Sequence, residues 1–114
     1  MKKDDTVFLN HVLAAIRQIR TYLGGLDFQA FFENRLVQDA VVRQLEVIGE
    51  ASRNLSEELR AAHPDVPWGQ IIGMRNRLTH AYFEVDLGVV WDVAEEDLPE
   101  LKQSVEAILG LEKP

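Results

Sequence analysis

The sequence predicts an all-α protein that folds as one antiparallel helical bundle, a single domain over residues 1–114. Three observations support this prediction. Apolar residues recur at steps of three and four along most of the chain, no stretch alternates polar and apolar residues, and the β-branched residues fall within the helical periods. A chain of 114 residues can also bury a core without disulfides or metal ions.

The first helix is predicted between Asp5 and Leu23, where the apolar residues follow the period of a single buried face. Gly24 and Gly25 end it, because glycine adopts the left-handed conformation in which many helices close. Asp27 is then the predicted N-cap of a short helical piece that carries three phenylalanines.

The second long helix is predicted to run without a break to Leu59, because seven apolar or small residues from Val37 onward lie within one narrow sector. Gly49 lies in the middle of this helix, where glycine costs about 1 kcal/mol relative to alanine. Its position beside Ala51 and Ser52 indicates the close approach of another backbone. The opposite face alternates acidic and basic residues, and we interpret it as solvated. Its members are Asp39, Arg43, Glu46, Glu50, Arg53 and Glu57.

Two helices are predicted after the turn at His63-Pro64. One runs from Trp68 as far as Tyr82 or Phe83, and the last runs from Leu87 to Ile108 with an apolar residue at alternating steps of four and three. Pro99 falls inside the last helix, and the apolar row keeps its phase across it, so we predict a kink rather than two unrelated helices. The apolar row of the last helix and the small residues of the second exceed what one small bundle needs internally. We therefore predict a homodimer that associates through helices.

Composition excludes several classes of function. The chain has no cysteine, so it has no disulfide, thiolate zinc site or cysteine nucleophile. Its net charge of −7 disfavours sequence-independent binding of nucleic acid by the monomer. The amino terminus enters an amphipathic segment with no long apolar run, which predicts neither a signal peptide nor a membrane span. We expect a cytoplasmic protein with no membrane partner.

The densest polar cluster is R-N-R-L-T-H-A-Y, residues 75–82. On a continuous helix Tyr82 shares the face of Arg75, whereas His80 lies about 140° away from Arg75. Arg75 and His80 can therefore converge in one of two ways. Either the helix ends near Thr79 and His80 turns back, or a second copy of the chain supplies the missing group.

Arginine and histidine together fit the chemistry of RNA cleavage. The guanidinium offers a fork of donors that suits phosphate, and imidazole both accepts and donates protons near pH 7. A histidine can take the proton of a ribose hydroxyl while an arginine stabilises charge on the phosphate, without a metal ion or another cofactor. By spacing alone, the same two residues are also typical of an ordinary helix surface.

The cluster belongs to a longer pattern. Residues 75–82 match R-x4-H-x-Y, and the surrounding motifs are I-G-E-A (48–51), L-S-E-E-L (55–59), H-P-D-V-P-W (63–68), M-R-N-R-L-T-H-A-Y-F (74–83), W-D-V (91–93) and D-L-P-E-L (97–101). In the order and spacing of these motifs the whole chain resembles the HepT-like ribonuclease toxins of the HEPN superfamily.

The resemblance implies a HEPN-like helical homodimer that acts as a metal-independent endoribonuclease on RNA. It assigns the catalytic roles to Arg75 and His80. It also implies a partner, a minimal nucleotidyltransferase (MNT) antitoxin of a type VII toxin-antitoxin system, which transfers AMP from ATP to Tyr82 and thereby neutralises the toxin. Transfer RNA and messenger RNA are equally compatible with a site that reads ribose and phosphate.

Other polar residues near the motif have weaker assignments. Asn76 is a supporting candidate that could orient the phosphate or His80, although an asparagine in a helix often faces solvent. Arg77, with Arg43 or Arg53, is expected to join Arg75 in a basic cleft.

The remaining candidates have a structural interpretation that we prefer. Asp39 and Glu46 could orient a catalytic cation, but a solvated face is favoured. Four aromatic residues are interpreted as core or surface positions rather than base-stacking groups or metal ligands: Trp68, Trp91, His11 and His63.

A non-catalytic function stays open as the alternative. A helical partner or substrate-binding subunit of a nucleotidyltransferase could use Arg75 and His80 to hold a nucleotide phosphate without cutting RNA. Binding alone does not require a group that titrates near neutral pH, which favours the enzyme.

Overall fold

The computed structural model describes residues 1–80 and 84–111, with only the backbone of His80 included. Helices dominate these residues, and the two strands are two residues long each, so the predicted all-α class is confirmed. The elements are α1 (Lys3–Leu23), α2 (Phe28–Phe32), α3 (Arg35–Arg53), α4 (Glu57–Ala62), α5 (Trp68–Ile72), α6 (Met74–Leu78), β1 (Thr79–His80), β2 (Glu84–Val85), α7 (Leu87–Asp92), the π-helical segment η2 (Val93–Asp97) and α8 (Leu98–Ile108).

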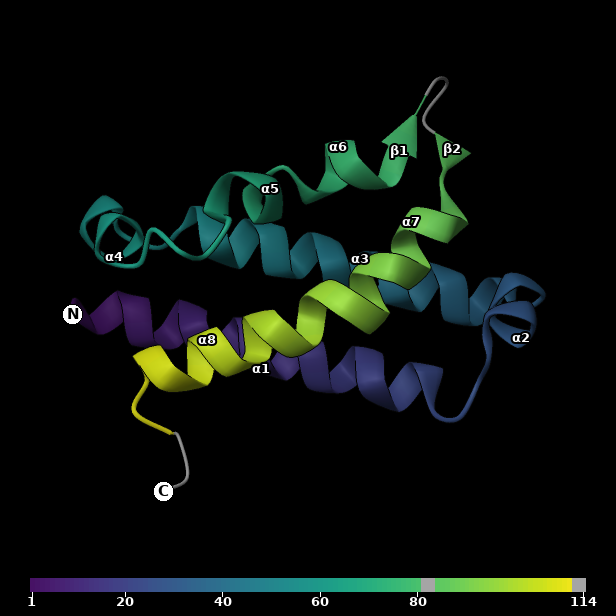
Figure 1. Ribbon diagram of the computed structural model, residues 1–114, viewed down its shortest axis with the longest axis horizontal. Helices are drawn as coiled ribbons and strands as arrows, with labels where there is room; N and C mark the ends of the chain where they lie inside the picture. Colours follow the sequence, from purple (N-terminus) through teal and green to yellow (C-terminus); the bar gives the residue numbers. More distant parts are fainter. Residues whose placement is uncertain (81–83, 112–114) are drawn as a thin grey trace.

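Helix α3 is the central element of the bundle (Figure 1). It packs along α1 on one side and against α5 and α6 on the other, while α7, η2 and α8 return along α3 and α1. The molecule measures 42 × 35 × 20 Å, and its shortest dimension equals about two helix diameters. The fold is therefore two layers of helices thick.

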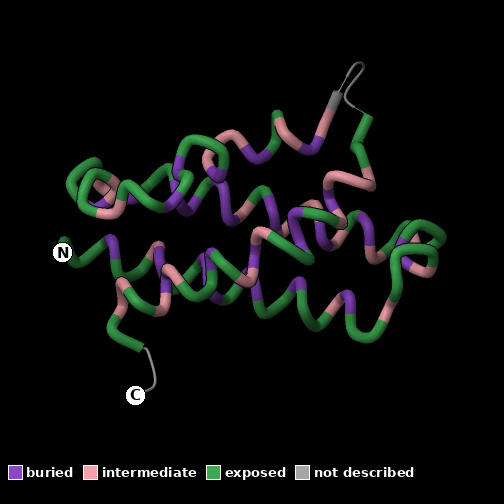
Figure 2. Tube along the Cα trace, in the orientation of Figure 1, coloured by how far each residue is buried: buried purple, intermediate pink, exposed green. Residues whose placement is uncertain are grey.

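The core consists of the apolar faces that meet between these layers. Buried positions recur at helical spacing on α1, α3 and α8, and the exposed positions face outward (Figure 2). The largest side chains with almost no exposure are Phe31, Leu9, Leu13, Ile16, Ile19, Leu45, Ile48, Met74, Leu78 and Leu98.

The end of α1 and the start of α2 follow the sequence predictions. Gly24 has a positive φ of 50°, and its N–H donates to the carbonyl of Arg20 at 3.0 Å. The carboxylate of Asp27 accepts a hydrogen bond from the N–H of Ala30 at 2.8 Å, so Asp27 caps α2 as expected.

The prediction of one unbroken helix to Leu59 is wrong, because α3 ends at Arg53. Ser56 is extended, with φ −63° and ψ 150°, and its hydroxyl accepts from the N–H of Leu59 at 3.1 Å to cap the new helix α4. Leu55 and Leu59 are buried as predicted. The apolar period therefore continues across the break, which is why it did not reveal that the helix stops.

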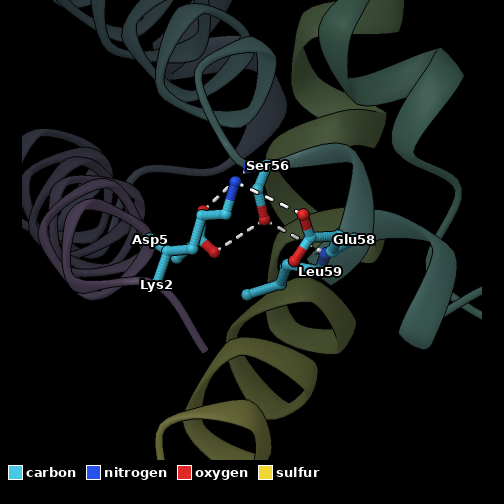
Figure 3. Close-up of polar contacts among 5 residues, drawn as sticks. All are labelled: Lys2, Asp5, Ser56, Glu58 and Leu59. Carbon is cyan, nitrogen blue, oxygen red and sulfur yellow. Dashed lines mark hydrogen bonds and ion pairs between the residues drawn. The ribbon is translucent and has the colours of Figure 1, made fainter.

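Asp5, in the first turn of α1, binds the turn between α3 and α4 through Ser56 (Figure 3). Its side chain is almost fully buried, and it accepts hydrogen bonds from the backbone N–H of Ser56 at 2.8 Å and from the Ser56 hydroxyl at 2.7 Å. Burial alone raises the pKa of Asp5, but the hydrogen bonds from Ser56 and the positive charge of Lys2 outweigh it, so the pKa is lowered. Lys2 also pairs with Glu58 at 3.3 Å.

Replacing Asp5 with asparagine is expected to lower the free energy of unfolding by about 1–3 kcal/mol near pH 7, the range for a hydrogen-bonded buried charge. A lowered folded pKa stabilises the protein above the unfolded pKa of about 4, and this contribution is lost as pH falls through the folded pKa. Urea unfolding from about pH 7 to about pH 2 should therefore show that the difference in unfolding free energy between Asp5→Asn and wild type becomes smaller in acid.

Asp4→Asn is the matched control, because Asp4 is exposed in the same first turn of α1. We expect it to change the stability by less than about 0.5 kcal/mol. If the stability of Asp5→Asn were lower than that of wild type by the same amount down to the lowest pH, this role of the Asp5 carboxylate would be contradicted.

The helix predicted from Trp68 to Tyr82 or Phe83 is also shorter than expected. Gly73 separates α5 from α6, and α6 ends at Leu78. The chain then enters a two-stranded antiparallel ladder in which His80 pairs with Glu84. The helix therefore ends near Thr79, as the first of the two routes requires, and the position of the His80 side chain in that route remains a prediction.

The last helix follows the prediction at Pro99. Helical geometry continues from α7 through α8, and η2 widens the turn directly before the proline, which lacks the N–H that a regular helix needs. The apolar row of this helix does not support dimerisation, because its members Ala94, Leu98, Leu101 and Val105 are buried in the core of the same chain. Over the described residues, no helix is both long and apolar enough to cross a membrane.

Candidate functional site

Gly49, in the middle of α3, lies where α5 and α6 pack on this helix. A Cβ atom at Gly49 would lie 2.9 Å from the carbonyl oxygen of Ile71 and 3.3 Å from the Cβ of Met74. The absence of a side chain therefore lets α5 and α6 approach α3, as the small residues in the sequence predicted. Met74 and Leu78 are buried, which fixes the rotation of α6 and leaves Arg75 exposed.

Arg75 lies at a hollow between α6 and the polar face of α3. The hollow has a volume of about 440 Å³, and Arg43 and Arg53 line it from α3 together with Glu46 and Glu50. Arg53 pairs with Glu50 at 3.8 Å. Within residues 1–80 and 84–111, no carboxylate lies within 4.0 Å of the guanidinium of Arg75 or Arg43. Their donors are therefore available to an anion.

The chain turns from helix to strand directly after Arg75. Thr79 is extended, with φ −116° and ψ 151°, and its hydroxyl donates to the carbonyl of Arg75 at 2.9 Å. The N–H of Asp86 donates to the carbonyl of Leu78 at 2.7 Å and closes the base of the hairpin. These bonds hold the backbone of His80 two residues beyond the end of the helix. The side chain of His80 lies outside the described part, so its convergence with Arg75 remains a prediction.

Arg77 does not join Arg75 in one cleft, contrary to expectation. Its guanidinium donates to the carboxylate of Asp97 at 3.0 Å, across the other side of α6. Arg77 and Asp97 line a separate hollow of about 240 Å³ between α5, α6 and α8. Two residues along a helix point about 160° apart from each other, which explains why neighbours in the motif face opposite sides.

Tyr82 lies outside the described residues. The interpretation that it shares a helical face with Arg75 is nevertheless wrong in its premise, because α6 ends at Leu78. Asn76 is exposed on α6, and the structure gives its side chain no hydrogen bond within the described chain. Its supporting role remains a prediction.

The structural interpretation holds for most other candidates. Trp68 is buried, and its indole N–H donates to the carbonyl of His63 at 3.0 Å. Trp91 is half-buried and packs against Phe31, with ring centroids 5.4 Å apart. His11 is exposed beside Phe8 on α1.

Asp39 and Glu46 are exposed on α3, but both line hollows beside the site rather than open solvent alone. Asp39 is 3.6 Å from Arg35, one turn earlier on the same helix. In the part of the chain that the structure describes, no three His, Asp or Glu side chains come together as a set of metal ligands.

The hairpin is the main feature of the site that sequence reasoning missed. A signal for it exists, because the run from Thr79 to Val85 is rich in β-branched and aromatic residues, which favour strands. The spacing of the apolar residues from Trp68 onward instead predicts a helix through this run. The consequence is that His80 belongs to a strand rather than to the helix that carries Arg75.

The geometry describes a site that can hold phosphate. The guanidinium groups of Arg75 on α6 and Arg43 on α3, neither of them paired with a carboxylate of the described residues, line a hollow that is open to solvent. In this hollow, three arginines face two glutamates. A guanidinium fork binds phosphate oxygens in pairs. The backbone of the motif histidine lies at the end of the same short helix.

A family model described as "Ribonuclease HepT-like" matches residues 12–108, most of the chain. Among curated relatives, a protein of Thermococcus cleftensis named "Probable ribonuclease HepT" is 38% identical over 108 residues, which cover 95% of this chain and 98% of that protein. A protein of Methanocaldococcus jannaschii, named as a proposed RNase, is 36% identical over 107 residues, covering 94% and 98% of the two chains.

A longer relative from Methanocaldococcus jannaschii carries two named activities, a gamma-glutamylcyclotransferase and a proposed RNase. It is 40% identical over 109 residues, which cover 96% of this chain but 49% of that protein. The chain thus spans about half the length of this relative. No solved structure gives a significant match.

Proposed function

Because this chain belongs to the HepT-like ribonuclease family, we propose that it is a metal-independent endoribonuclease and the toxin of a HepT/MNT (type VII) toxin-antitoxin system. The observation that carries the proposal is the position of Arg75. Its guanidinium is free of carboxylates in the described chain and faces a hollow that two more arginines line. Three guanidinium groups around one hollow favour the binding of a phosphate there.

The proposed reaction uses the RNA's own hydroxyl as nucleophile. His80, as neutral imidazole, accepts the proton of the ribose 2′-hydroxyl, and the resulting oxygen attacks the adjacent phosphorus. The bond from phosphorus to the 5′-oxygen breaks, and that oxygen takes up a proton. The products are a 2′,3′-cyclic phosphate and a 5′-hydroxyl. Arg75 stabilises the negative charge that develops on the phosphate oxygens.

Incubation of purified, unmodified protein with labelled RNA in EDTA tests the function. The expected result is cleavage that survives EDTA and leaves cyclic phosphate ends. Full retention of intact RNA under these conditions would refute the enzyme and favour the alternative, a non-catalytic partner of the nucleotidyltransferase that holds a nucleotide phosphate. A growth test with and without co-expression of the nucleotidyltransferase proposed as antitoxin then shows whether cleavage is toxic.

We further propose that the protein acts as a homodimer. Exposed apolar side chains on α2 and the start of α3 support a contact with another protein surface: Phe28, Phe32 and Leu36 are 40%, 57% and 80% exposed, respectively. Light scattering at micromolar concentration measures the oligomeric state, and a monomer would contradict this part of the proposal.

Control of the toxin is proposed to act through Tyr82. The phenol oxygen attacks the α-phosphorus of ATP, the bond to pyrophosphate breaks, and AMP remains attached to the tyrosine. A phosphate and an adenosine so close in sequence to Arg75 would compete with RNA for the guanidinium. Modification therefore silences the enzyme without unfolding it.

Tyr82→Phe is expected to prevent this modification, because the phenylalanine ring has no oxygen to accept AMP. After co-expression with the nucleotidyltransferase, intact mass should show AMP additions on wild type and none on the variant. The variant should also still cut RNA and resist neutralisation. Tyr22→Phe is the matched control, since Tyr22 is a half-buried tyrosine on α1, and it should be modified like wild type.

A further inference from the structure

Two hollows meet along the polar face of α3. The first, of about 440 Å³, is the hollow that contains Arg75. The second, of about 650 Å³, lies nearer the start of α3 and extends to the base of the hairpin at Glu84 and Val85. Arg43 and Glu46 line both hollows, so the two adjoin at these residues. Each has a volume in the range of ligand-binding clefts.

The arginines of this surface are not equivalent. Arg35 pairs with Asp39 at 3.6 Å, and Arg53 pairs with Glu50 at 3.8 Å, each on the same helix. Arg43 lies between them, and no carboxylate of the described residues comes within 4.0 Å of its guanidinium. It shares this state with Arg75, which lines the same hollow from α6.

Charge makes this surface unusual for the chain. The net charge is −7, yet the hollow shared by Arg43 and Arg75 contains three arginines and two glutamates. At physiological ionic strength, charges further than about 8 Å are largely screened. A polyanion bound in this hollow therefore responds mainly to its three arginines and two glutamates, whereas two arginines and three carboxylates line the second hollow.

We propose that Arg43 binds a backbone phosphate of single-stranded RNA next to the phosphate held by Arg75, at the place where the two hollows adjoin. The inference rests on the proposed ribonuclease function and adds a binding residue to it. Arg43 contacts the backbone and not the bases, because its contribution comes from a guanidinium on a phosphate. It raises affinity without taking part in the chemical step.

Binding of an uncleavable 2′-O-methyl RNA oligonucleotide, followed by fluorescence anisotropy over a range of salt concentrations, tests this role. For single strands, the plot of log affinity against log salt loses about 0.7 of its slope for each phosphate contact removed. Arg43→Gln is expected to bind more weakly than wild type with a slope shallower by about 0.7. Arg43→Lys, which keeps the charge, should retain the slope.

Arg17→Gln is the matched control, because Arg17 is an exposed arginine on α1, away from both hollows. It should match wild type in affinity and slope. Equal affinity and slope for Arg43→Gln and wild type would overturn the inference, and so would the absence of RNA binding by wild type at low salt.

Cleavage assays separate this inference from the proposed function. If wild type cuts RNA and Arg43→Gln shows an unchanged KM, only the role of Arg43 is wrong. If wild type binds the oligonucleotide through Arg43 but cuts no RNA, the phosphate site stands and the ribonuclease proposal fails. The expected result is a raised KM in Arg43→Gln with kcat within about twofold of wild type.

Discussion

His80→Ala is expected to reduce RNA cleavage by about 10²–10⁴-fold, the usual contribution of a general acid or base. The reason is that no other group would take the proton from the ribose hydroxyl as it attacks. The loss should appear in kcat, since the histidine acts in the chemical step rather than in binding. Labelled RNA in EDTA gives the rate, and circular dichroism checks that the variant is folded.

His11→Ala is the matched control for this experiment. His11 is exposed on α1 and contacts Phe8 edge-on, so its removal changes the histidine count without touching the motif. Its rate should equal that of wild type. A loss of less than about threefold in a folded His80→Ala protein would remove His80 from the mechanism.

Arg75→Lys should also cut RNA slowly, because an ammonium group cannot reproduce the fork of the guanidinium.

Gly49→Ala is expected to destabilise the protein by about 1–3 kcal/mol, the usual cost of overpacking. Alanine favours a helix more than glycine does, so propensity alone predicts the opposite sign. The new Cβ would lie 2.9 Å from the carbonyl oxygen of Ile71, closer than real contacts allow, and α5 must move away from α3. This movement shifts α6 and with it Arg75, so cleavage should also slow in the folded variant.

Gly69→Ala separates the two effects. Gly69 is also a helical glycine, in α5, but a Cβ atom there would meet nothing within 4 Å. We expect this variant to be as stable as wild type or more stable by up to about 1 kcal/mol. Urea unfolding of both variants measures whether each substitution raises or lowers the free energy of unfolding. If Gly49→Ala were as stable as Gly69→Ala, the close packing of α3 on α5 would not hold α6 in place.

Periodicity in the sequence was sufficient to predict the helices that carry the core. The faces of α1, α3 and α8 are long enough for the period to be clear, and Gly24, Asp27 and Gly49 behave as their chemistry predicted. The break after Arg53 was missed because Leu55 and Leu59 keep the same apolar phase on both sides of it. Two contacts of Ser56 accompany the break: its hydroxyl caps α4 locally, and its N–H donates to Asp5, 51 residues earlier in the chain, a contact that the apolar period does not reveal.

The site was predictable in its residue types and less so in its geometry. The chemistry of arginine and histidine pointed to residues 75–80, and the possibility that the helix ends near Thr79 followed from their angular separation. The opposite directions of Arg75 and Arg77 follow from their spacing of two residues on one helix, but the pairing of Arg77 with Asp97, twenty residues later, is not visible in the motif. The relation of Arg43 to Arg75 likewise depends on how α6 packs on α3.

The shortness of α6 has a thermodynamic consequence for the whole molecule. Five residues are far fewer than the roughly 12–15 that a helix needs to persist by itself, so α6 is helical only while Met74 and Leu78 remain docked and Arg77 remains bonded to Asp97. Its opening is a separate equilibrium from global unfolding and costs less free energy. Arg75 therefore belongs to a small cooperative unit whose closed population sets the fraction of molecules in which Arg75 lines its hollow. A partner that binds the open form would lower that fraction while α1 and α3 stay folded.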